Sequence, residues 1–160
     1  SAEETFSTYR SVRLTQPLPP SIAAKQRLLD SLVVGYRRAV DLGVPEWAHA
    51  ATYRIGEALV AFGEALENSE RPADLTGDDL KGYENVLLEQ AMNFHSQGES
   101  VWSDLLRRTK GAAADPWTAR TRNALWSRLG DRFLFLAEGE VPLVEDPAAR
   151  PAPRAKEAKP

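Results

Sequence analysis

The chain has 160 residues, enough for one domain, and its 42% hydrophobic and 27% charged residues are proportions typical of globular proteins. A mean hydropathy of −0.41 is too low for direct membrane insertion, and a net charge of −3 without a basic stripe argues against nucleic-acid binding. The absence of cysteine excludes disulfides, thiol nucleophiles and thiolate metal sites.

The first predicted helix is short and covers residues 2–14. The run Gln16-Pro17-Leu18-Pro19-Pro20 ends it, because proline lacks an amide donor and biases the preceding residue toward extended backbone. We expect Ser21 to cap the next helix, which then begins at about Ile22.

The second and third predicted helices, residues 22–42 and 45–68, form a hairpin. Only Gly43 and Val44 separate them, so the two helices must lie antiparallel and in contact. Apolar residues recur on the third helix at spacings of three and four, which places them on one face. This predicted face consists of Trp47, Ala51, Ile55, Ala58, Leu59, Phe62 and Leu66.

Two glycines on the third predicted helix, Gly56 and Gly63, lie seven residues apart on one side. Each costs the helix about 1 kcal/mol relative to alanine. We therefore expect another helix backbone to approach closely at this side, with tolerated surface glycines as the alternative.

A fourth helix is predicted over residues 78–108. A fifth begins at Pro116, with Asp115 as its cap, and ends near Gly130. One more short helix is expected over residues 131–138.

The predicted helical domain covers residues 1–140. Residues 141–160 hold five of the eleven prolines among alanines and charges, and they cannot bury enough apolar surface to fold alone. We expect this segment to be a flexible or extended tail that packs on a partner. The predicted fold class is all-α: antiparallel hairpins arranged as a tetratricopeptide-like solenoid or as an irregular bundle of five to six helices.

Several short runs resemble one family of helical repeats. They are Tyr36-Arg37-Arg38-Ala39-Val40, the Pro45-Glu46-Trp47 helix start with the later Arg54-Ile55-Gly56, Phe62-Gly63-Glu64-Ala65-Leu66, and Pro72-Ala73-Asp74-Leu75. Over about residues 22–108 the chain resembles the C-terminal region of large bacterial cell-envelope tetratricopeptide-repeat proteins, including some found with gliding-motility and Tol-type machinery. The resemblance implies a non-catalytic scaffold or adaptor in an envelope assembly.

Metal and catalytic motifs are incomplete. Glu46 and His49 have the spacing of di-iron carboxylate bundles, but His95 has no glutamate three residues before it, so we expect no metal site. His95 and Glu99 have the spacing of a helical surface pair. Without a nucleophile motif or a phosphate loop, we predict no catalytic residues and no cofactor.

The aromatic residues divide into two predicted groups. Trp47 and Trp117, at helix starts, are expected in the core or between hairpins. Aromatic and arginine residues away from the main apolar faces are typical of binding surfaces. The predicted partner-binding residues are Trp102, Trp126, Tyr53, Arg107 and Arg122. The alternative, that these tryptophans cover neighbouring helices, stays open.

These patterns favour a non-catalytic protein-interaction scaffold whose partner is another protein or a second copy of the chain. The family resemblance implies a periplasmic or envelope-associated location in a bacterium, with the cytoplasm as the alternative. A helical bundle that binds a small ligand or metal, and acts as an enzyme, is the alternative function. A structural spacer is a third.

Overall fold

The computed structural model describes residues 2–113 and 115–130 of the chain. This part contains five helices and no strand, which confirms the predicted all-α fold class. The helices are α1 (Ala2–Ser11), α2 (Leu18–Asp41), α3 (Pro45–Glu67), α4 (Gly77–Arg108) and α5 (Pro116–Leu129). The predicted short helix over 131–138 and the predicted tail over 141–160 lie outside the described residues.

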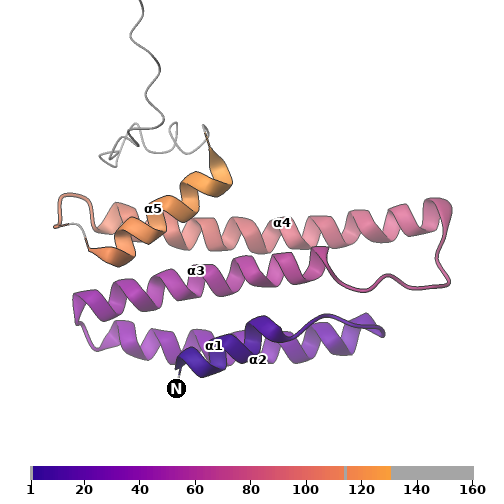
Figure 1. The fold of residues 1–160 in the computed structure, drawn as a ribbon, viewed down its shortest axis with the longest axis horizontal. Coiled ribbons are helices and arrows are strands. Elements are labelled where there is room, and N and C mark those ends of the chain that lie inside the picture. The colour runs from indigo at the N-terminus through magenta and orange to yellow at the C-terminus, as the bar shows by residue number, and fades with distance from the viewer. Residues whose placement is uncertain (1, 114, 131–160) are drawn as a thin grey trace, which may run out of the picture.

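Helix α3 lies at the centre of the arrangement (Figure 1). It packs antiparallel to α2 on one side and to α4 on the other, and it also contacts α1 and α5. No close helix–helix contact joins α2 to α4 or to α5 within the described chain. The described helices are therefore held together largely through α3.

The start of α2 differs from the prediction. The helix begins at Leu18, with Pro17 in an extended N-cap conformation and Pro19 and Pro20 in its first turn. A start at Ile22 with Ser21 as cap is therefore wrong. The first amides of a helix have no partner within the helix, so prolines are tolerated there. The Ser21 hydroxyl instead accepts a hydrogen bond from the Thr15 amide at 3.0 Å.

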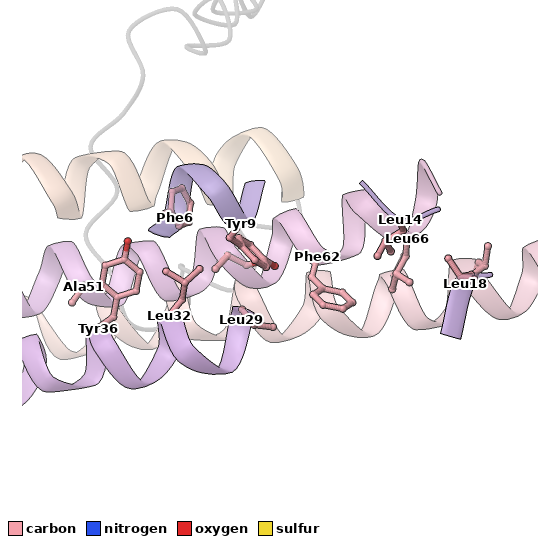
Figure 2. Packing of buried hydrophobic residues seen from close by; sticks show 13 residues of the cluster. Phe6, Tyr9, Leu14, Leu18, Leu29, Leu32, Tyr36, Ala51, Phe62 and Leu66 are labelled. Carbon is pink, nitrogen blue, oxygen red and sulfur yellow. The ribbon is translucent and has the colours of Figure 1, made fainter. Parts of the chain in front are cut away.

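Two apolar clusters make up the core of the described residues. The larger joins α1, α2, α3 and the first half of α4, and Figure 2 shows its packing. Phe62 lies fully buried within it and stacks on Phe94 of α4, with ring centroids 4.3 Å apart. The smaller cluster joins α3, α4 and α5 through Val60, Trp102, Leu106 and Leu125.

A buried lysine attaches α1 to the rest of the molecule. Lys25 of α2 donates hydrogen bonds to the carbonyls of Tyr9 and Val12, at 2.8 and 2.7 Å, where α1 ends. The Tyr9 hydroxyl donates to the Ala58 carbonyl of α3 at 2.6 Å. Burial, followed by the charge of Arg10, lowers the pKa of Lys25 to about 8. Lys25 thus caps the C-terminal end of α1, where the Tyr9 carbonyl also accepts a hydrogen bond from the Val12 amide at 3.3 Å.

The close approach predicted at the two glycines of α3 is confirmed. A Cβ atom at Gly56 would lie 2.3 Å from Nε1 of Trp102, and one at Gly63 would lie 2.8 Å from the Ala91 carbonyl oxygen. Both neighbours belong to α4. The missing side chains let α4 pack closely on α3 and leave room for the Trp102 indole.

Candidate interaction surface at the α2–α3 turn

Three large apolar side chains are exposed where α2 turns into α3. Leu42 is 65%, Val44 40% and Trp47 56% exposed. Gly43, with φ +69°, and the helix-starting Pro45 form the turn that carries them. We call Leu42, Val44 and Trp47 the apolar tip. Exposed apolar side chains gathered in one place often mark an interaction site.

The exposure of Trp47 contradicts its predicted core position. Trp47 shares the apolar face of α3 with the buried Ala51, Ala58 and Phe62. It stands in the first turn of α3, however, where the neighbouring described helices leave more than half of its surface uncovered. Helical spacing identifies which residues share a face, but it does not show how far the packed partners extend along it.

A partly open hollow of about 290 Å³ lies beside the apolar tip. It is formed where the end of α2, the first turns of α3 and the end of α4 come together. Its lining residues are Val40, Ala48, His49, Thr52, Val101, Asp104, Leu105, Arg108 and Thr109. Val40 and Ala48 lie close in sequence to the segment that carries the tip, whereas Leu42, Val44 and Trp47 themselves do not line the hollow.

His49 connects this hollow to the start of α5. Its Nδ1 lies 2.7 Å from Oδ2 of Asp115, whose Oδ1 accepts hydrogen bonds from the amides of Trp117 and Thr118. Asp115 thus caps α5 as predicted, and the Thr118 hydroxyl completes a capping box. His49 therefore binds the cap of another helix.

Electrostatics at this contact favour a charged Asp115. Partial burial alone would raise the pKa of its carboxyl group. The hydrogen bonds from Thr118, His49 and Trp117 outweigh burial and hold the pKa below its ordinary value.

Arg108, at the edge of the hollow, is a cation without a charged partner among the described residues. No ion pair or hydrogen bond joins its side chain to the described residues, whereas the nearby Asp104 pairs with Arg107. The hydroxyls of Thr52 and Thr109 donate to carbonyls of their own helices. The surface therefore combines an apolar tip and hollow with an available positive charge.

Trp102, predicted to lie on a partner surface, is instead buried. Only 3% of it is exposed; its Nε1 donates to the Tyr53 carbonyl at 2.9 Å, and its ring stacks on Tyr53 with centroids 5.7 Å apart. The prediction of surface exposure is wrong because Gly56 leaves room for the indole against α3. The position of Trp102 agrees with the alternative that it covers a neighbouring helix, which is α3.

The other predicted partner residues do not gather on one exposed surface. Tyr53 and Trp126 are half-buried and pack on the smaller cluster between α3, α4 and α5. Burial, followed by the charge of Glu57, raises the pKa of Tyr53. Arg122 is half-buried, and its Nε is buried without a hydrogen bond. Of the five, only Arg107 is exposed.

Trp117, predicted in the core or between hairpins, is half-buried at the start of α5. Its ring centroid lies 5.7 Å from that of Tyr53 on α3. The guanidinium groups of Arg120 and Arg54 lie 4.8 and 5.8 Å from the Trp117 ring. Trp117 thus packs between α3 and its own helix.

The helical spacing of His95 and Glu99 suggested that they form a pair, but they do not pair with each other. Its Nε2 lies 3.1 Å from Oε1 of Glu67 at the end of α3, and Glu99 instead accepts a hydrogen bond from Arg128 of α5. Both side chains therefore make contacts between helices. Within residues 2–113 and 115–130, no three histidine or acidic side chains are grouped so that they could hold a metal ion.

None of the helices described here is long and apolar enough to cross a membrane. Comparisons with protein-family models, with curated proteins and with solved structures found no match to this chain.

The apolar tip and its hollow were not among the sequence predictions. The signal that could have found the tip is three large apolar residues around the Gly43–Pro45 turn, where polar residues are usual. The hollow had no comparable signal, because Val40, His49 and Leu105 meet only in the folded chain.

Proposed function

We propose that this chain is a non-catalytic protein-interaction module that binds a partner protein at the α2–α3 turn. The observation that carries the proposal is the exposure of Leu42, Val44 and Trp47 beside a hollow of about 290 Å³. Apolar contacts of this kind supply most of the binding energy at protein interfaces, and tryptophan is among the residues that contribute most.

The shape and charge of the surface indicate what kind of segment it binds. The hollow, at about 290 Å³, is at the lower limit of the roughly 300–1,000 Å³ of small-molecule sites, and suits an apolar side chain of a partner. Trp47 and Leu42 would cover the residues on either side of that anchor. Arg108 favours an acidic residue close to the anchor.

The sequence resemblance extends this proposal to a setting. It supports a scaffold or adaptor in a bacterial envelope-associated assembly, in the manner of tetratricopeptide-repeat proteins. The apolar tip is compatible with that role because a scaffold needs a protein-binding surface and no reactive centre.

A small anionic ligand is the second candidate occupant of the hollow. The pairing of His49 with Asp115 favours it, because the carboxylate orients the imidazole and Nε2 makes no hydrogen bond to described residues. Such a ligand would contact His49 and Arg108. Trp47 does not line the hollow, so removal of its ring separates the two candidates: only partner binding depends on it.

Selection from a displayed library of random peptides on the immobilised chain tests the proposed function. We expect enrichment of peptides with a large apolar residue next to an acidic one. For a selected peptide, Trp47→Ala should raise Kd about 10-fold or more, which corresponds to about 1.4 kcal/mol.

Val86→Ala is the matched control. Val86 is also exposed, but it precedes Val101 of the hollow by 15 residues, or about 22 Å along α4. Its replacement should leave Kd unchanged. Circular dichroism verifies that both variants are folded. Equal affinity of the Trp47→Ala variant and the unchanged chain would refute peptide binding at the tip.

A further inference from the structure

One face of α4 is covered along only half of its length. Helical spacing places Leu88, Met92, His95, Glu99, Trp102 and Leu106 in a single row along this helix. At the C-terminal end of the row, Leu106 and Trp102 are buried against Leu125 of α5. At the other end, Met92 is 61% and Leu88 50% exposed.

The cover of this row stops where α5 ends. Helix α5 starts beside His49, near the last turn of α4, and runs back along α4 until Arg128 bonds Glu99 at 2.9 Å. Figure 1 shows α5 over the half of α4 that ends at Arg108. The described chain thus ends close to the point where the row becomes exposed.

The sequence that follows α5 is strongly apolar. Phe133, Leu134, Phe135 and Leu136 are four large apolar residues in succession. Met92 lies seven residues before Glu99, or about 10 Å along α4, and Leu88 lies eleven residues before it, or about 16 Å. From Arg128, five to eight residues reach Phe133–Leu136, and in extended form they span about 16–26 Å. The segment can therefore reach both exposed side chains.

We propose that Phe133–Leu136 binds the exposed row at Leu88 and Met92 of the same chain. The segment would extend the cover that α5 provides and bury its own aromatic rings, which would otherwise add to the exposed apolar surface. Contact between this segment and the side chains of Leu88 and Met92 is favourable because it removes apolar surface of both from water. This surface is separate from the α2–α3 turn and does not depend on the proposed function.

Cysteine protection in the 160-residue chain tests this contact, because this chain contains no cysteine. The thiol introduced by Met92→Cys should react with a maleimide about 10-fold or more slowly than the thiol introduced by Val34→Cys, an exposed position on α2. Adding Phe133→Ser, Leu134→Ser, Phe135→Ser and Leu136→Ser should remove the protection at position 92. Equal rates at positions 92 and 34 in the otherwise unchanged chain would overturn the proposal.

A photo-crosslinking amino acid at position 92 identifies the occupant without altering the segment. We expect mass spectrometry to find crosslinks to Phe133–Leu136 within a monomer. The same probe at position 34 should give none to that segment. Crosslinks between two chains, or protection that disappears on dilution, would show that a second copy covers the row. Either result overturns the assignment to the chain's own segment.

Discussion

Asp115 joins two helices through the two oxygens of one carboxylate. Oδ1 accepts the first free amides of α5, and Oδ2 binds His49 of α3. Both contacts favour the charged form, which is why the pKa of this group is lowered although burial alone would raise it.

The contribution of Asp115 to stability should depend on pH. A carboxyl group whose pKa is lower in the folded chain stabilises the fold fully above its unfolded pKa of about 3.9. This contribution is lost as the pH falls through the lower folded value. Asp115→Asn keeps a capping side chain but no charge, so it should cost about 0.5–1 kcal/mol at pH 6 and progressively less below pH 4. Urea unfolding at several pH values measures the difference, and a constant difference from pH 6 to pH 2.5 would contradict the expectation.

At the scale of helices, the close contact between α3 and α4 depends on glycines, which have no side chain. A Cβ atom at Gly98 of α4 would lie 2.7 Å from the Gly56 carbonyl oxygen and 2.7 Å from Cγ2 of Val60. A backbone oxygen cannot rotate away as the end of a side chain can. The two helices must therefore separate, or α4 must shift, to admit even one methyl group.

Gly98→Ala should accordingly destabilise the chain by about 1–3 kcal/mol, because overpacking outweighs the gain in helix propensity. Gly82→Ala is the matched control on the same helix, since a Cβ atom there meets nothing within 4 Å. That variant should gain up to about 1 kcal/mol. Thermal unfolding of both variants tests the opposite signs. A stabilised Gly98→Ala variant would show that the contact can relax without cost.

The sequence predicted these helices well because their boundaries depend on local chemistry. Gly43, Pro45 and Asp115 stop, start and cap helices through backbone geometry and nearby amides, and the structure places them as expected. Pro19 and Pro20 led to a wrong predicted start for α2, because the proline ring that breaks a helix interior is tolerated in a first turn.

Burial at the candidate surface could not be predicted in the same way. Trp47 and Trp102 exchanged their predicted environments for reasons that lie in other segments. Trp102 is buried because Gly56, 46 residues earlier, leaves space for its ring. Trp47 is exposed because the neighbouring described helices leave it uncovered in the first turn of α3. Periodicity assigns a residue to a face, whereas burial also needs the position of the partner along the helix.

At the scale of the whole molecule, α3 and α4 each contribute residues to both apolar clusters. The larger cluster includes α1 and α2, while the smaller one includes α5, and α2 and α5 are not in close contact. Among the described helices, α5 packs its buried Leu125 against α3 and α4. We therefore expect α5 to open at a lower free energy than the helices around the larger cluster.

Hydrogen exchange on two core variants tests this division. Leu125 and Phe62 are both fully buried, so replacement by alanine should cost about 2–5 kcal/mol in each case. Leu125→Ala should accelerate exchange about 30-fold or more in α5 and leave the slowest amides of α2 almost unchanged, because α5 can open alone. Phe62→Ala should accelerate exchange in α2, α3 and α4 together, because its ring lies in the cluster that they share with Phe94. If Leu125→Ala accelerated α2 as much as α5, the described helices would unfold as one unit, and α3 would transmit every local loss to the whole chain.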